Sequence, residues 1–120
     1  VVAWGTGSAL RDFMHVDDMA AASIHVMGIK PEIYYNNITP MCSHINVGSG
    51  EDCSIKELTE IIARVTGFKG RVTWDSSKSD GAPRKLMNSS KLSRLGWNST
   101  IKLESGLENA YNFFLRDHNA

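Results

Sequence analysis

The sequence predicts an α/β fold in a single domain of 120 residues. Short apolar segments typical of strands alternate along the chain with longer segments in which apolar residues recur at helical spacing. The predicted helices follow predicted strands, which is the order found in α/β proteins. A hydrophobic content of 42% and a charged content of 22% are ordinary for a globular domain with one core.

The first third of the chain begins with extended segments and continues into a helix. Residues 1–4, VVAW, predict a short strand, and residues 10–16 alternate apolar and polar side chains, as an extended segment does. Asp17 is a favourable N-cap for a helix that runs to about Met27. A proline then ends the helical pattern, and residues 31–43 are expected to be irregular or to form one short helix.

The strongest local signal lies in the middle of the chain. Residues 44–48, HINVG, predict a strand. Ser54 and Glu57 have the spacing of a capping box at the start of a helix. That helix carries an apolar stripe through Val65, and Gly67 suits its C-terminal end.

The last third continues the alternation. Residues 71–75, RVTWD, predict another strand. Asn88 or Ser89 can cap a short helix that ends near Leu95, and a final helix is expected over residues 102–117.

The charge is balanced overall but uneven along the chain. Thirteen Lys and Arg offset thirteen Asp and Glu, so the whole chain has no bias toward nucleic acid or an acidic membrane surface. Residues 64–94 nevertheless hold eight cations and two acids, with Trp74 inside this stretch. A solvated basic face is one interpretation, and binding of single-stranded nucleic acid is a weaker one.

Other classes of site find little support in the sequence. Two cysteines, Cys42 and Cys53, form no metal-binding spacing and are expected to be free thiols in a reducing compartment. The four histidines are scattered, so no metal site is predicted. No apolar run approaches the roughly 20 residues of a transmembrane helix.

Residues 45–75 imitate a dinucleotide-binding unit, with an apolar strand, Gly48-Ser49-Gly50, a helix and a final acid. Three features count against a cofactor there. Cys53 occupies the third glycine position, two acids would face the phosphates, and the capping box starts the helix too late to direct its N-terminus at them. We therefore predict no cofactor-binding residue in this chain.

The segment SDGAPRK, residues 79–85, combines a stiff turn with an acid and two adjacent cations. Such a loop is either a solvated turn or one wall of a site for an anionic ligand.

Several segments together resemble a known family. They are RDFMHVDDMAAASIHVM (11–27), SHINVGSGEDCSIKELTEIIARVTGFKG (43–70), SDGAPRKLMNSSKLSRLGW (79–97) and SGLENAYNFFL (105–115). They are similar to the C-terminal part of the GDP-L-fucose synthases, which are epimerase/reductases of the extended short-chain dehydrogenase/reductase family. The resemblance covers essentially the whole chain. It implies the substrate-binding lobe of such an enzyme, without the N-terminal Rossmann domain.

The resemblance also implies the activity and the partners. The full enzyme would convert GDP-4-keto-6-deoxy-D-mannose to GDP-L-fucose with NADP, which the N-terminal domain would bind together with the catalytic residues. This chain would contribute no catalytic residue and would be inactive alone. Residues 44–67 resemble a strand and helix that return to the Rossmann sheet. The expected partners are a GDP-sugar, the chain's own N-terminal domain and, as one assembly, a second copy, in the cytoplasm.

Four substrate-binding residues carry over by motif: Trp4, Arg11, Asp80 and Lys85. Arg11 and Lys85 suit a pyrophosphate, Asp80 suits the donor edge of guanine, and Trp4 offers a flat apolar face. The role of Arg84 is left open. Each residue also has a structural interpretation: an edge-strand aromatic for Trp4, an ion pair with Asp17 or Asp18 for Arg11, a turn acceptor for Asp80 and a solvated cation for Lys85.

Two alternative functions remain at this point. One is the substrate domain of another nucleotide-sugar epimerase or dehydratase, which nucleotide preference would separate. The other is a non-catalytic protein-interaction domain, which would lack any response to nucleotides.

Overall fold

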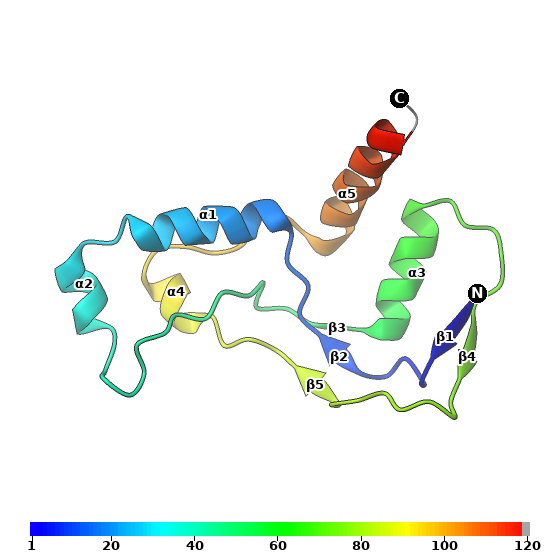
Figure 1. The fold of residues 1–120 in the computed structure, drawn as a ribbon, viewed down its shortest axis with the longest axis horizontal. Helices are drawn as coiled ribbons and strands as arrows, with labels where there is room; N and C mark the ends of the chain where they lie inside the picture. Colours follow the sequence, from blue (N-terminus) through cyan, green and yellow to red (C-terminus); the bar gives the residue numbers. More distant parts are fainter. Residues whose placement is uncertain (119–120) are drawn as a thin grey trace.

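The computed structural model describes residues 1–118 and shows a flat, elongated molecule (Figure 1). Its principal axes measure 54 × 40 × 18 Å, and its Cα radius of gyration is 17.8 Å. A compact domain of this length would have a radius of gyration of about 14 Å. The elements are therefore spread out in a plate and do not surround one central core.

The strands are short and form two separate small sheets. In chain order they are β1 (Val2–Trp4), β2 (Leu10–Arg11), β3 (Cys53–Ser54), β4 (Thr73–Asp75) and β5 (Arg84–Lys85). Strand β1 pairs in parallel with β4, and β2 lies between the antiparallel β3 and the parallel β5. The strands predicted at 1–4 and 71–75 are confirmed as neighbours, and the extended segment predicted at 10–16 contains only β2 as a strand.

The strand expected at 44–48 is wrong, because the structure has no strand there. A strand requires ladder hydrogen bonds to a neighbour, and no segment within residues 1–118 pairs with this one. The alternation that suggested a strand is nevertheless present. Ile45 and Val47 line a pocket beside α1 (Val16–Met27), whereas His44 and Asn46 line another pocket beside α4 (Ser90–Arg94).

The predicted helices are all present. The remaining ones are α2 (Pro31–Asn36), α3 (Ile55–Val65) and α5 (Leu103–His118). Pro31 both ends the pattern of α1 and starts α2, since proline is well tolerated in the first helical turn. In Figure 1, α5 projects from the plate near α3, and an ion pair with 2.7 Å between Arg64 Nη2 and Glu104 Oε1 joins the two helices.

The N-cap of α1 is His15, so the expectation of Asp17 is wrong. His15 Nδ1 accepts a hydrogen bond of 3.2 Å from the backbone N–H of Asp17. Asp17 is a residue type that caps helices well, but here it lies inside the first turn. Its negative charge is still favourable there, because it faces the positive end of the helix dipole.

The capping box of α3 is confirmed. Ser54 Oγ accepts from the backbone N–H of Glu57 at 3.1 Å, and Glu57 Oε2 accepts from the backbone N–H of Ser54 at 2.8 Å. The hydrogen bond from the Ser54 backbone is the main reason that the pKa of Glu57 lies below its usual value. Gly67, with φ of +66°, follows the end of the helix as expected.

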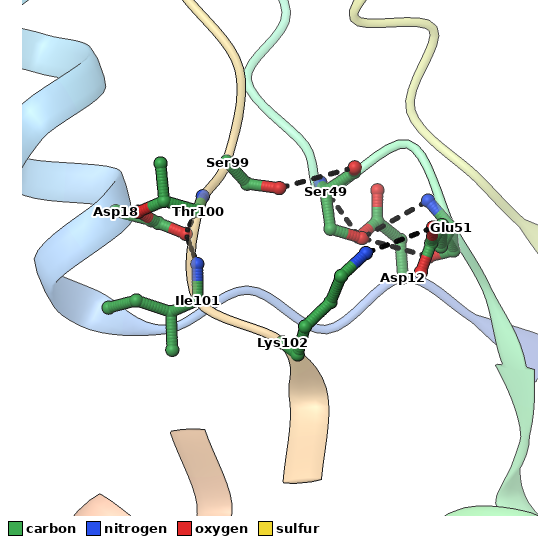
Figure 2. A network of polar contacts seen from close by, with 8 residues as sticks. All are labelled: Asp12, Asp18, Ser49, Glu51, Ser99, Thr100, Ile101 and Lys102. Atoms are coloured by element: carbon green, nitrogen blue, oxygen red, sulfur yellow. Dashed lines mark hydrogen bonds and ion pairs between the residues drawn. The ribbon is translucent and has the colours of Figure 1, made fainter. Parts of the chain in front are cut away.

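A buried carboxylate joins α1 to the segment that leads into α5 (Figure 2). Asp18 is 3% exposed and accepts hydrogen bonds from the backbone N–H groups of Thr100 and Ile101, both at 2.9 Å, and from the Thr100 hydroxyl at 3.0 Å. Burial by itself raises the pKa of Asp18, but these bonds outweigh it and leave the pKa below its usual value. The group therefore stays charged inside the fold.

The same network continues toward α3 (Figure 2). Asp12 Oδ1 accepts from the backbone N–H of Ser49 at 3.1 Å, and Ser99 Oγ donates to the Ser49 carbonyl at 3.4 Å. An ion pair of 3.5 Å joins Lys102 Nζ to Glu51 Oε1. Polar contacts therefore fix the middle of the plate, where three distant stretches of the sequence meet.

The buried apolar core is small, and much apolar surface is exposed. The buried apolar residues are Ala9, Ala22 and Leu92. The accessible surface is 8461 Å², whereas a compact monomer of 13.3 kDa exposes about 6,500 Å². Met27, on the outer face of α1, is 86% exposed. Within residues 1–118, no helix is long and apolar enough to cross a membrane.

Candidate functional site

Arg11 and Lys85 lie next to each other on adjacent strands. They are register partners in the parallel pairing of β2 with β5. The pairing continues on both sides, because the Leu10 N–H donates to the Pro83 carbonyl at 2.8 Å and the Asp12 N–H to the Lys85 carbonyl at 3.3 Å. Register partners on neighbouring strands project to the same face of a sheet. The two cations predicted to meet a diphosphate therefore share one face.

Arg84 points to the opposite face and anchors the loop. Its guanidinium forms two hydrogen bonds to Asp52, of 2.5 Å from Nε to Oδ2 and 3.2 Å from Nη2 to Oδ1. The hydrogen bond to Asp52 is the main cause of a raised pKa of Arg84. This pair ties the 79–85 loop to the residues just before α3, so the structure gives Arg84 a structural role.

Asp80 reaches back to the turn that follows β1. Its Oδ1 accepts the backbone N–H of Thr6 at 2.7 Å and that of Gly7 at 3.3 Å, and its Oδ2 accepts the Thr6 hydroxyl at 2.6 Å. The hydroxyl bond from Thr6 contributes most to a pKa of Asp80 below the usual value. The carboxylate is half-buried and stays ionised at neutral pH.

Trp4 presents an open aromatic ring at the end of β1. Its residue surface is 73% exposed. The ammonium of Lys78 lies 5.7 Å from the ring centroid, a favourable cation–π distance. The backbone is fixed, because Trp4 is paired with Asp75 of β4. The ring is therefore available as a platform for a flat group.

Asp80 and Lys85 belong to the 79–85 loop, Arg11 pairs with Lys85, and Trp4 lies beside β4, shortly before the loop. Asp80 holds the turn after Trp4, and Lys85 ends the loop beside Arg11. Arg11 Nη2 lies next to Gly81, 3.8 Å from where a Cβ would be, and Gly81 has a φ of +73° that favours glycine. The loop thus connects the aromatic platform to the two cations.

The acids considered as partners of Arg11 are engaged elsewhere. Asp17 lies beside His15, with 3.7 Å between Oδ2 and Nδ1, and Asp18 holds residues 100–101. Arg11 Nη1 donates to the Leu10 carbonyl at 2.6 Å, which directs the guanidinium along the strand.

Sequence reasoning missed two residues of this region, Thr6 and Lys78. Thr6 supplies two of the hydrogen bonds to Asp80, and Lys78 covers one side of Trp4. Signals for both are present in the sequence. Thr6 stands between two glycines, a composition typical of a turn, and Lys78 belongs to the basic stretch at 64–94.

Residues 48–54 do not fit the diphosphate of a dinucleotide cofactor. A Cβ placed at Gly48 would lie 2.6 Å from Asp12 Oδ2 and 2.7 Å from Met87 Cβ, so the space beside this glycine is already filled. The N–H of Ser49 already donates to Asp12. Residues 48–54 therefore leave no room for a dinucleotide diphosphate at this turn.

The sequence matches known proteins closely. Residues 1–37 match the family model described as the NAD dependent epimerase/dehydratase family. The chain is 56% identical over 117 residues to GDP-L-fucose synthase from Escherichia coli, covering 98% of this chain and 36% of that protein. It is 47% identical over 117 residues to a probable GDP-L-fucose synthase from Oryza sativa, of which it covers 33%. The chain thus spans about a third of the length of these curated relatives.

Solved structures show the same fold. A GDP-6-OMe-4-keto-L-xylo-heptose reductase from Campylobacter jejuni superposes with a TM-score of 0.85 at 33% identity, over 98% of this chain and 34% of that one. A GDP-L-fucose synthetase from Naegleria fowleri gives a TM-score of 0.80 at 23% identity, over 99% of this chain and 34% of that one, which supports the fold alone. The chain is therefore similar over nearly its whole length to GDP-L-fucose synthases, and it corresponds to about a third of the length of each.

Proposed function

We propose that this chain is the GDP-sugar-binding part of an NADP-dependent enzyme that converts GDP-4-keto-6-deoxy-D-mannose to GDP-L-fucose. The observation that carries the proposal is the pairing of Arg11 with Lys85 on one face of β2 and β5, beside the 79–85 loop. Two adjacent cations match the charge of a diphosphate. Arg11 offers a planar fork for two phosphate oxygens, and Lys85 offers a compact charge.

The remaining candidate residues complete the site at the nucleoside end. Trp4 would stack on the guanine base, and Asp80 shapes the turn between Trp4 and the cations. Gly81 and Pro83 restrict the loop, which lowers the ordering cost when a ligand binds. The similarity to GDP-L-fucose synthase from Escherichia coli and to GDP-L-colitose synthase from Yersinia pseudotuberculosis supports a GDP-sugar ligand.

The contribution of this chain to the reaction is positioning. The reaction inverts C3 and C5, which flank a C4 ketone that stabilises the carbanion, and then reduces that ketone. Holding the GDP group fixes the sugar ring against groups that do this chemistry, which we place outside this chain together with the NADP site. The chain alone should then turn over no substrate.

The chain's own N-terminal domain is the partner that we propose for the exposed apolar surface. Three surfaces would suit it: the outer face of α1, the unpaired segment 44–48, and an apolar groove of about 460 Å³ between α3 and α5. Segment 44–48 would add a strand to the sheet of that domain, since its alternation is intact and its backbone lacks a neighbour. The cytoplasm is the compartment that we propose, because both cysteines are free.

The test is a nitrogen–proton NMR titration of the chain with GDP, with ADP and UDP as controls. We expect signals of Arg11 and of the 79–85 loop to shift with GDP and much less with ADP or UDP. Arg11→Lys should weaken GDP binding about tenfold or more, because lysine cannot supply the two-pronged contact. Arg94→Lys, on α4 and away from the loop, is the matched control and should bind as the original chain does.

A second candidate is a protein-interaction domain without a nucleotide site, which the large exposed apolar surface favours. It predicts self-association or partner binding with no shift from any nucleotide. A preference for UDP in the same titration would instead indicate the substrate domain of another nucleotide-sugar enzyme.

A further inference from the structure

We infer that Asp80 is a positioning residue: its carboxylate holds the 5–7 turn through Thr6 and so orients Trp4, and it does not itself contact the nucleotide base. This inference rests on the proposed GDP-binding function and deepens it. It concerns how the site is held in its binding geometry before a ligand arrives. It also implies that Asp80 is not the source of the preference for guanine.

The hydrogen-bonding capacity of Asp80 is directed into the protein. Two backbone N–H groups reach Oδ1, at 2.7 Å from Thr6 and 3.3 Å from Gly7. The Thr6 hydroxyl reaches Oδ2 at 2.6 Å. A carboxylate that accepts three hydrogen bonds from one turn has most of its four acceptor sites occupied. To bind two guanine donors, it would have to give up at least one of these three hydrogen bonds.

The 5–7 turn also packs closely against the Asp80 carboxylate. Gly5 and Gly7 have φ of +80° and +78°, which glycine adopts readily. A Cβ at Gly5 would overlap the Asp80 carboxylate, and a Cβ at Gly7 would lie 2.6 Å from the Trp74 ring. The turn is therefore packed between a carboxylate on one side and an aromatic ring on the other, and it has little freedom to move.

We call the 5–7 turn and its hydrogen bonds to Asp80 the clamp. The clamp lies between the two parts of the proposed site, the Trp4 ring and the two cations. Trp4 immediately precedes the turn, and the chain then runs through Ala9, which is buried, into β2 with Arg11. Asp80 itself belongs to the loop that ends at Lys85. One carboxylate thus sets the distance between the aromatic platform and both cations. The backbone of Trp4 is paired with Asp75, and its exposed ring lies beside the ammonium of Lys78.

A comparison of the affinities for GDP and inosine diphosphate distinguishes a positioning role of Asp80 from direct contact with the base. The base of inosine diphosphate lacks the exocyclic amine of guanine. If Asp80 acts through the turn, then Thr6→Val and Asp80→Asn should each lower the affinity for both nucleotides several-fold. The ratio of the two affinities should stay unchanged. The double variant should be no weaker than the weaker single variant, since both changes break the same link. Thr6→Ser keeps the hydroxyl and should restore binding.

A spectroscopic signal without ligand provides an independent readout. The Trp4 indole N–H signal should shift in Thr6→Val and in Asp80→Asn, and should stay in place in Thr6→Ser. The matched control is Ser77→Ala, which removes a hydroxyl that donates to Asp75 Oδ1 at 2.6 Å in the neighbouring turn. This control should change neither the Trp4 signal nor the affinities, and dispersed spectra verify that each variant is folded.

The possible failures are distinguishable. If Asp80→Asn reduces the preference for GDP over inosine diphosphate while Thr6→Val does not, Asp80 contacts the base, and the inference is overturned while the proposed function stands. If both variants leave the Trp4 signal and the affinities unchanged, the clamp has no role. If the original chain binds neither nucleotide while the Trp4 signal shifts as expected, the clamp exists, but the proposed function and the role of the clamp in binding are both overturned.

Discussion

The carboxylate of Asp18 connects two segments of the chain that are 82 residues apart. It is buried, and its three hydrogen-bond donors come from Thr100 and Ile101. Removing the carboxylate leaves these donors without their partner in a site that water enters poorly. The penalty for such groups is larger than the net gain of an ordinary hydrogen bond.

Asp18→Ala should therefore lower the free energy of unfolding by about 2–3 kcal/mol, measured by urea denaturation at pH 7. Because the pKa of Asp18 is lower in the folded chain than in the unfolded chain, its stabilisation is present above the unfolded pKa. It is lost as the pH falls through the folded pKa, so the two proteins should converge in stability in acid. Asp17→Ala, on the exposed side of the first turn, should cost less than about 1 kcal/mol. Equal stability of Asp18→Ala and the original chain at pH 7 would contradict this role.

Residue-level features of the site were predictable from the sequence only in part. Arg11 and Lys85 belong to motifs, and their pairing across β2 and β5 agrees with a shared ligand. The glycines on both sides of Thr6 indicate a turn, but they do not reveal its role, which depends on Asp80, 74 residues away in the sequence. A capping residue can also be misassigned: Asp17 is a preferred N-cap type, but the ring nitrogen of His15 makes the capping contact.

The helices were the elements best predicted, because their signals are local. The capping box, the apolar stripe and the terminal glycine of α3 are all read within a dozen residues, and each contributes to the same helix. Strands depend on a neighbour from elsewhere in the chain. This is why residues 44–48 look like a strand in the sequence and yet form none, since no segment among residues 1–118 pairs with them.

The capping box of α3 should contribute measurably to stability. Ser54→Ala should lower the free energy of unfolding by about 1 kcal/mol, since it leaves the N–H of Glu57 without its acceptor. Thermal or urea denaturation measures the change. Ser105→Ala, at an exposed position of α5, is the control and should not destabilise the chain, because alanine is the better helix former. A larger loss at Ser105 than at Ser54 would refute this assignment.

The whole molecule is flat and exposes more surface than a compact protein of its mass. Sequence composition cannot reveal this, because the apolar residues of α1 and of segment 44–48 would be equally suitable for an internal core. What differs is whether another layer of protein is present to cover them. The N-terminal domain that we propose as a partner would be such a layer, and hydrophobic periodicity carries no sign of it.

Hydrogen exchange should map this uncovered side. The backbone amides of residues 45–47 should exchange rapidly in the monomeric chain, because no neighbouring strand accepts from them. Amides inside α3, such as those of Ile61 and Ile62, should exchange more slowly and serve as the internal reference. Slow exchange at 45–47 that does not depend on protein concentration would contradict the unpaired state, whereas protection that grows with concentration would reveal pairing between copies.

The long-range links of the plate also determine when the chain can fold during its synthesis. Strand β1 cannot pair until β4 has been synthesised, and β2 cannot pair with β5 until β5 has been synthesised. The carboxylate of Asp18 lacks its donors until Thr100 has been made. Each early segment therefore depends on one that is made far later. Loops of this size close slowly, and their contacts form late. A ribosome that has made the first half of this chain therefore holds α1 without its buried anchor. The turn beneath Trp4 is likewise not fixed until Asp80 has emerged.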